Sequence, residues 1–237
     1  MNTNENNPLL LAGSVIVAGL LIAGAVFWNG SRPTAPAGGA PAVVKVDIKD
    51  VKTTGEPFIG QADAPTTIAF WSDFQCPYCK AFEIGHPQVP TPAAFPDILK
   101  NYVDTGKVKV VFKDVAFLGA DSMTGAIYSQ AVWALYPTEY HKWRTTYFEN
   151  QDQEHAGFGT AASIDAMNAK IAGLDAVKIA KDVKDNMSKY TAHVQATTAE
   201  AQKLGVKSTP SVIVGKELIA GAYPFAKFQE AIDKVVK

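Results

Sequence analysis

The stretch SDFQCPYCKAFE, residues 72–83, contains both cysteines of this 237-residue chain, Cys76 and Cys79. The run TTIAFW, residues 66–71, precedes it and predicts a buried strand, because it is short, apolar and β-branched and follows the turn-forming ADAP. Pro77 directly follows Cys76. Proline suits the first turn of a helix, where its missing N–H has no partner to lose. The sequence therefore predicts a strand that ends just before Cys76 and a helix that begins there.

The CPYC spacing favours thiol chemistry. Residues at i and i+3 share one face of a helix, so the two sulfurs can approach bonding distance. The free N–H groups and the dipole at a helix N-terminus stabilise negative charge, which lowers a thiol pKa below the ordinary ~8.5. We expect Cys76 to be the exposed nucleophile and Cys79, one turn inside, to be the resolving thiol.

Two other uses of the cysteine pair fit the sequence less well. A zinc site needs four ligands, and the four histidines are scattered without ligand spacing. A static disulfide across so short a loop removes little entropy from the unfolded chain. We therefore predict neither a metal nor another cofactor. A working pair without further thiols suits an oxidising compartment.

The N-terminus predicts a membrane anchor. Residues 9–28 carry no charge, and twenty helical residues span the roughly 30 Å of a bilayer core. Residues 1–8 contain Glu5 and no Lys or Arg, whereas a signal peptide begins with basic residues. Cleavage remains the alternative, since small residues such as Ala35 and Ala37 follow the span. We expect an uncleaved, single-pass anchor with residues 1–8 in the cytoplasm.

The remainder divides into a linker and one domain. Residues 29–42 are rich in Pro, Gly and Ala and predict a flexible tether that reaches on the order of 40 Å. Residues 43–237 have the length and composition of a single folded domain. The chain has 22 basic and 23 acidic residues, so it lacks the positive charge of a nucleic-acid-binding protein. The thiol chemistry, and not the charge pattern, places the domain on the extracytoplasmic side of the cell membrane.

The domain alternates between strand and helix patterns after the CPYC motif. In chain order we predict a proline-rich loop at 86–96, a helix at 97–104, a strand at 107–115, mostly helix at 121–204, a hairpin of strands at 211–214 and 217–221, and a helix at 224–236. Gly215 and Lys216 form the predicted hairpin turn. In the last helix, Phe225, Phe228 and Ile232 are expected to face the core.

Residues 55–237 resemble the thioredoxin superfamily, and the helical block resembles its DsbA-like branch of exported disulfide oxidoreductases. The likeness is carried by DAPTT, SDFQCPYCKAFE, KLGVKSTPSVIV and GAYPFAKF, and a CxxC followed at this distance by GVxxTP is a specific combination. The resemblance implies an α/β protein with a thioredoxin fold and a helical domain inserted at about 119–204.

The resemblance also assigns supporting residues. Pro210 is expected to form a cis peptide bond facing the sulfurs and to leave Thr209 free to hydrogen-bond a substrate backbone. An ordinary trans proline that opens a strand is the alternative. Pro77 and Tyr78 form the dipeptide between the cysteines, which tunes the reduction potential in this superfamily.

One departure from the family pattern concerns proton transfer. Relatives place a buried acid on the strand before the motif, at about the position of Ala69 in this chain. Asp73 and Glu83 are candidates for its role, although each also fits an ordinary solvated carboxylate. Lys80 could support a thiolate or lie on the surface.

Four aromatic residues in the helical block have two interpretations: they line a groove for unfolded chains, or they pack in the core. Helical spacing favours the core. These residues are Trp133, Trp143, Tyr147 and Phe148.

These features predict a membrane-anchored, outward-facing thiol:disulfide oxidoreductase that acts on exported cysteine-containing polypeptides. We expect a dithiol oxidase that a quinone-linked membrane partner reoxidises. It should be a monomer, because the tether has no heptad stalk. The alternatives are a disulfide reductase or isomerase using the same cysteines, and a redox-inert thioredoxin-like binding module.

Overall fold

The computed structural model describes residues 46–153 and 156–236. The predicted cytoplasmic segment, anchor and linker, residues 1–8, 9–28 and 29–42, lie outside the described residues. Within the described part of the chain, no helix combines the length and apolar character needed to cross a bilayer.

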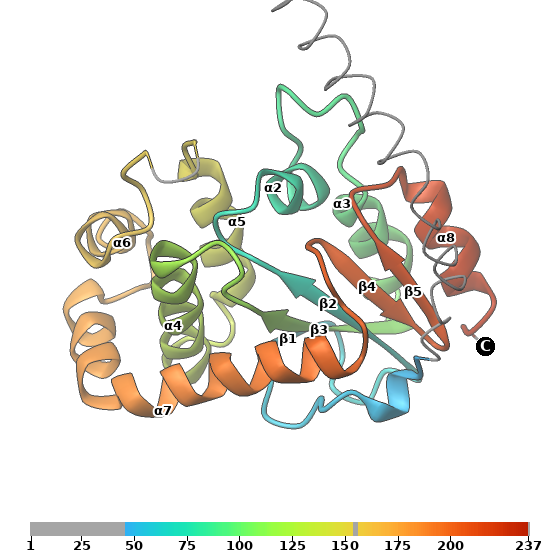
Figure 1. Cartoon of the computed structure of the whole chain (residues 1–237), viewed down its shortest axis with the longest axis horizontal. Helices are drawn as coiled ribbons and strands as arrows, with labels where there is room; N and C mark the ends of the chain where they lie inside the picture. The colour runs from blue at the N-terminus through green and yellow to red at the C-terminus, as the bar shows by residue number, and fades with distance from the viewer. Residues whose placement is uncertain (1–45, 154–155, 237) are drawn as a thin grey trace, which may run out of the picture. The chain divides into compact units, whose positions relative to one another are not determined.

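A five-stranded mixed sheet forms the centre of the domain (Figure 1). Its strands are β1 (Phe58–Ile59), β2 (Thr66–Ser72), β3 (Val108–Asp114), β4 (Ser211–Val214) and β5 (Glu217–Ala220). Their order across the sheet is β1-β3-β2-β4-β5, with β2 and β3 parallel and the other pairs antiparallel. Because β2 is the middle strand, the cysteine motif that follows it lies at the centre of one sheet edge.

Helices pack against the sheet, and the chain between β3 and β4 is a block of helices (Figure 1). They are η1 (Ile48–Asp50), α2 (Pro77–Glu83), α3 (Phe95–Ile98), η2 (Leu99–Val103), α4 (Ala120–Leu135), α5 (Tyr140–Asn150), α6 (Ala161–Asn168), α7 (Ala176–Lys203) and α8 (Phe225–Asp233). The four helices α4 to α7 match the helical block expected from the apolar spacing.

The predicted strands before and after the motif are confirmed, as is the hairpin turn, where Gly215 has a φ of 57°. The helix predicted at 97–104 begins two residues earlier, at Phe95, and its second half, η2, is a π-helix. Sequence reasoning missed η1 and β1. A strand of two residues is too short to show an alternating pattern.

The two faces of the sheet bury separate apolar clusters, because successive strand residues point to opposite sides. Ile68 and Phe70 of β2 pack with the cysteine helix α2, with α3 and α8 and with the helical block. Ala69 and Trp71 pack with the C-terminal end of α7 and the segment that contains η1. The long helix α7 crosses below the sheet in Figure 1.

The helical aromatic residues belong to the core, as their spacing predicts. Trp143, Tyr147 and Phe148 are fully buried. Trp133 is half-buried, and its ring centroid lies 5.2 Å from that of Phe58. They are therefore not available as an open substrate groove. In α8, Phe228 and Ile232 are buried as expected, whereas Phe225 is only half-buried.

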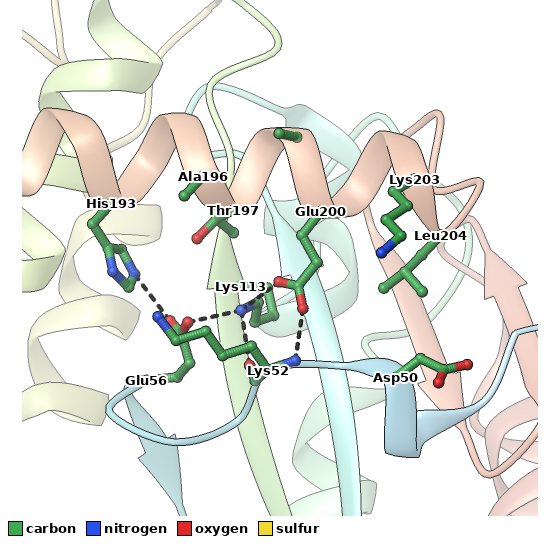
Figure 2. A pocket seen from close by; sticks show the side chains of 11 residues that line it. Asp50, Lys52, Glu56, Lys113, His193, Ala196, Thr197, Glu200, Lys203 and Leu204 are labelled. Atoms are coloured by element: carbon green, nitrogen blue, oxygen red, sulfur yellow. Dashed lines mark hydrogen bonds and ion pairs between the residues drawn. The ribbon is translucent and has the colours of Figure 1, made fainter.

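A buried lysine joins three segments on the α7 side of the sheet (Figure 2). The Nζ atom of Lys113, on β3, lies 2.8 Å from Glu56 Oε1 and 2.7 Å from Glu200 Oε2 on α7. It also donates to the carbonyl oxygen of Lys52 at 2.9 Å. All three ammonium protons therefore have acceptors, which compensates the cost of removing the charge from water.

This lysine cluster lies beside a cavity of about 700 Å³ between α7 and residues 50–56, lined in part by His193 and Lys203. His193 Nε2 contacts Glu56 Oε2 at 3.0 Å. None of the site residues predicted from the sequence lines this cavity. The cluster therefore serves to fasten the start of the domain to α7.

Replacing Lys113 with methionine should lower the free energy of unfolding by about 3–5 kcal/mol, because Glu56 and Glu200 lose a shared buried partner. Urea unfolding at pH 7 measures the change. Lys109→Met is the matched control: Lys109 lies on the same strand, and its Nζ atom contacts the carbonyl oxygen of Ala62 and the ring of Phe58, with no carboxylate partner among the described residues. A Lys113→Met loss no larger than that of Lys109→Met would contradict the role of the buried ion pairs.

Candidate active site

The cysteine helix α2 begins where the sequence predicts. Cys76 is its N-cap residue, with φ −77° and ψ 119°, and Pro77 occupies the first turn. The carbonyl oxygen of Cys76 accepts hydrogen bonds from the N–H groups of Cys79 at 3.1 Å and Lys80 at 3.2 Å. These bonds close the first turn and bring the two cysteine side chains to the same side of the helix.

Both cysteines are free thiols in this structure, and their surroundings differ. A hydrogen bond from the Cys79 side chain and the N–H groups at the helix start lower the pKa of Cys76 to about 7, against the opposing effect of burial. Burial, together with the neighbouring Cys76 sulfur, raises the pKa of Cys79 well above its ordinary value. At neutral pH one sulfur is therefore partly a thiolate and the other is a thiol.

The expectation of an exposed Cys76 is wrong in degree, because only 6% of the residue is exposed. Cys79 is completely buried, so Cys76 is still the more accessible of the two. Part of the cover comes from the loop before β4, where the Cys76 thiol donates to the carbonyl oxygen of Thr209 at 3.4 Å.

The peptide bond between Thr209 and Pro210 is cis, as the resemblance implies. Pro210 is buried and Thr209 is half-buried. The carbonyl oxygen of Pro210 accepts a hydrogen bond from the N–H of Gly221 at 2.8 Å, just after β5. The structure therefore brings Thr209 and Pro210 to the cysteines, although more than 130 residues separate them in the sequence.

Asp73 is not a solvated carboxylate, because it is completely buried. One carboxylate oxygen accepts from Gln75 N at 2.9 Å and Ser122 Oγ at 2.5 Å; the other accepts from Phe117 N at 2.7 Å and Leu118 N at 3.1 Å. Burial raises the pKa of Asp73, and these four bonds oppose the rise. Asp73 therefore ties the segment before Cys76 to the start of α4.

Glu83 is also buried, and it pairs with Arg144 of α5. Arg144 Nε lies 2.9 Å from Glu83 Oε2, Nη2 lies 2.8 Å from Glu83 Oε1, and Nη1 lies 2.6 Å from Asp114 Oδ1. Burial raises the pKa of Glu83 to about 7, and the arginine opposes the rise. Two carboxylates thus share one cation that is itself completely buried.

Neither candidate acid contacts a thiol through its carboxyl group. Asp73 meets the cysteines through its backbone: its N–H donates to Cys79 Sγ at 3.5 Å, and its carbonyl oxygen accepts from the N–H of Cys76 at 3.0 Å. The strand before the motif offers no acid either. Phe70 is the residue on the α2 side, with its ring 4.8 Å from that of Phe82, and Ala69 faces the other cluster.

Tyr78 and Lys80 point away from the buried thiols. Tyr78 is 56% exposed, which suits a residue that meets a partner chain. Lys80 Nζ donates to the carbonyl oxygen of Gln151 at 2.8 Å instead of approaching a sulfur. Desolvation lowers the pKa of Lys80.

Sequence reasoning missed Arg144 and Gln151. Arg144 lies four residues after Tyr140 and three before Tyr147, on the apolar face of α5, and this placement was the available signal for a buried cation. Gln151 follows α5, and its Nε2 atom donates to the carbonyl oxygens of Phe74 and Cys76. No periodic pattern marks a residue at a helix end.

Comparisons with known proteins agree with this geometry. A sequence model described as thioredoxin matches residues 52–234. Disulfide bond formation protein D of Bacillus subtilis is 29% identical over 188 residues, which cover 77% of this chain and 78% of that protein. A probable disulfide bond formation protein D of Bacillus cereus is 27% identical over 186 residues, covering 76% and 78%.

Solved structures share the fold. Oxidised BdbD from Bacillus subtilis has a TM-score of 0.68 at 24% identity, covering 81% of this chain and 96% of that one. The thiol-disulfide exchange protein alpha-DsbA2 from Wolbachia pipientis has a TM-score of 0.65 at 22% identity, covering 79% and 90%. The thioredoxin fold with a helical insertion is thus confirmed for the described domain.

Alkylation of the reduced protein should distinguish the two thiols. Because its pKa is lowered to about 7, Cys76 should react with iodoacetamide at a rate that rises with pH and reaches half its maximum near pH 7. Cys79 should stay unmodified below pH 9 because it is buried and its pKa is raised. Peptide mapping by mass spectrometry assigns each site. Equal labelling of both residues, or a midpoint near 9, would contradict the asymmetry.

Replacing Glu83 with glutamine should change how stability depends on pH. Unfolded Glu83 loses its proton near pH 4.5 and folded Glu83 near 7, so the folded state holds the extra proton between these values and wild-type stability falls as pH rises. Between pH 4.5 and 8, the free energy of unfolding of Glu83→Gln should therefore rise relative to that of the wild type by on the order of 3 kcal/mol. Urea unfolding of both proteins across this range measures the difference.

The exposed Glu230→Gln is the control for this titration, because its partner Lys234 lowers the pKa of Glu230 and no such gain is expected. A difference between Glu83→Gln and wild type that stays constant with pH would refute the assignment of a raised Glu83 pKa.

Proposed function

Because the chain belongs to the thioredoxin family, as a DsbA-like thiol:disulfide oxidoreductase, we propose that it forms disulfides in exported proteins with Cys76 as the nucleophile. The observation that carries this proposal is the unequal pair of thiols at the start of α2. The Cys76 pKa is lowered to about 7, and Cys79, one turn inside, is fully buried with a raised pKa. In such a pair, only the Cys76 sulfur is within reach of a substrate thiolate, so the disulfide forms and opens through Cys76.

In the oxidised enzyme, a substrate thiolate attacks Cys76 Sγ, and the bond to Cys79 Sγ breaks. Cys79 leaves with the electron pair and, given its raised pKa, takes up a proton. A second substrate thiolate then attacks the substrate sulfur of the mixed disulfide and releases Cys76 as a thiolate. The substrate has lost two electrons to form its disulfide, and both enzyme thiols are reduced.

Thr209 and Pro210 support substrate binding in this proposal. The Cys76 thiol hydrogen-bonds to the Thr209 carbonyl oxygen in the free enzyme, so a bound chain that turns toward Cys76 meets the same loop. The exposed ring of Tyr78, between the two cysteines, extends that surface. Pro77 holds the helix start in its first-turn geometry.

The pKa of Cys76 bears on the direction of electron flow. A Cys76 pKa of about 7 resembles that of the reductant thioredoxin, about 7, more than that of the oxidant DsbA, about 3.5. This favours disulfide reduction as a second candidate. We place oxidation first because the two Bacillus relatives are named a disulfide bond formation protein and a probable one.

The cellular setting belongs to the same proposal. An uncharged segment at residues 9–28 anchors the chain in the cell membrane, and residues 29–42 tether the domain on the extracytoplasmic side. The reduced enzyme needs an acceptor for two electrons, and a quinone-linked protein in the same membrane fits that need. Asp73 and Glu83 are the proposed proton donors to Cys79; because neither carboxyl group contacts a thiol, the transfer needs an intervening group.

Equilibration of the purified domain with glutathione buffers tests the direction. A reduction potential near −120 mV supports the oxidase, and one near −270 mV supports the reductase. Cys76→Ser should abolish oxidation of a dithiol peptide. Reduced Cys79→Ser, mixed with the disulfide form of the same peptide, should accumulate a mixed disulfide, because the Cys76 thiolate opens the peptide disulfide and the enzyme has no second thiol to release it. A wild-type protein that neither oxidises the peptide nor reduces insulin would overturn the enzymatic proposal and favour a redox-inert binding module.

A further inference from the structure

A glutamine from the helical block reaches the backbone of the cysteine motif. Gln151 is the C-cap of α5, and only 6% of it is exposed. Its Nε2 atom donates to the carbonyl oxygen of Phe74 at 2.8 Å and to that of Cys76 at 3.3 Å. One side-chain amide thus holds two peptide groups on either side of Gln75, immediately before α2.

The contact is reciprocal. Lys80, in α2, donates from Nζ to the carbonyl oxygen of Gln151 at 2.8 Å. Gln75, inside the held segment, donates from its own Nε2 atom to the carbonyl oxygen of Phe158 at 3.0 Å, further along the same connection between α5 and α6. The segment before Cys76 is therefore fixed to this connection from both sides.

The position of the amide has an electrostatic consequence. The Cys76 carbonyl oxygen already accepts two bonds from the first turn of α2, and the amide N–H adds a third donor. Hydrogen-bond donors to this oxygen weaken the negative electrostatic potential that the oxygen produces at the sulfur of the same residue. A negative charge on that sulfur is stabilised as a result.

We propose that Gln151 is a positioning residue that favours the reduced, thiolate form of Cys76 and thereby makes the enzyme a stronger oxidant. The proposal rests on the proposed function, since it concerns the poise of the same thiol pair. It gives the helical insertion a part in the chemistry. The insertion acts through one amide and not through a group that contacts substrate.

The test compares Gln151→Met and Gln151→Glu with the wild type in two measurements, the equilibrium with glutathione and the alkylation of the reduced proteins. Methionine keeps the length of the side chain and removes the donor, so the equilibrium constant for reduction of the disulfide by glutathione should fall. The fall should be at most about fivefold, the full effect of one neutral hydrogen bond, because the donor contacts the carbonyl oxygen and not the sulfur. The Cys76 pKa, measured by the pH dependence of alkylation, should rise. Glutamate also adds negative charge, so it should shift both quantities further, by about tenfold or more in the equilibrium constant.

Asn168→Leu is the matched control. Asn168 is a buried amide of the same helical block, and its Oδ1 atom accepts from Trp143 Nε1 at 2.7 Å, without a hydrogen bond to the motif. Its loss should lower the stability of the domain in urea and leave both the Cys76 pKa and the glutathione equilibrium unchanged. A purely structural role for Gln151 predicts that its variants behave like this control.

The outcomes separate the two proposals. If the wild type equilibrates with glutathione and the Gln151 variants keep its pKa and equilibrium constant, the positioning role is wrong and the proposed function stands. If the wild type does not exchange with glutathione at all, the proposed function fails. A graded shift from glutamine to methionine to glutamate, absent in Asn168→Leu, supports the inference.

Discussion

The completely buried guanidinium of Arg144 holds the architecture of the active site together. It joins Glu83 at the end of α2 to Asp114 at the end of β3, and it lies over the ring of Phe112, 4.4 Å from its centroid. Removing three charges from water is costly, and the hydrogen bonds on both sides of the planar cation compensate that cost. Helix α2 is therefore fixed to the sheet by a geometry that tolerates little displacement.

Around this fixed helix, the site is assembled from distant parts of the chain. Asp73 ties the segment before Cys76 to α4, Gln151 ties it to the end of α5, and Thr209 approaches from the loop before β4. The sulfur of Cys76 thus lies among backbone carbonyls and amides held from several directions. A reactive group in such surroundings keeps the same environment while its bonding partner changes, as thiol exchange requires.

The sequence predicted the parts of this site that depend on local rules. Pro77 marked the helix start, and the apolar runs marked both central strands. The burial of Asp73 and Glu83 was not predictable in the same way, because it depends on partners such as Ser122 and Arg144 that lie 49 and 61 residues further along the chain. Likewise, a glutamine at the end of α5 has no local pattern that reveals which carbonyl oxygens it meets. Charge pairs and amide contacts formed by folding require the three-dimensional arrangement.

The consecutive residues Lys113 and Asp114 at the end of β3 face opposite sides of the sheet. Lys113 meets Glu56 and Glu200, whereas Asp114 meets Arg144. Sliding β3 by one position would exchange the two faces, so the ammonium group would confront the guanidinium and the aspartate would confront the glutamates. Each charge would then share a face of the sheet with buried charges of its own sign. This dipeptide therefore fixes the register of the parallel strands β2 and β3. The position of the cysteines at the edge of the sheet depends on that register.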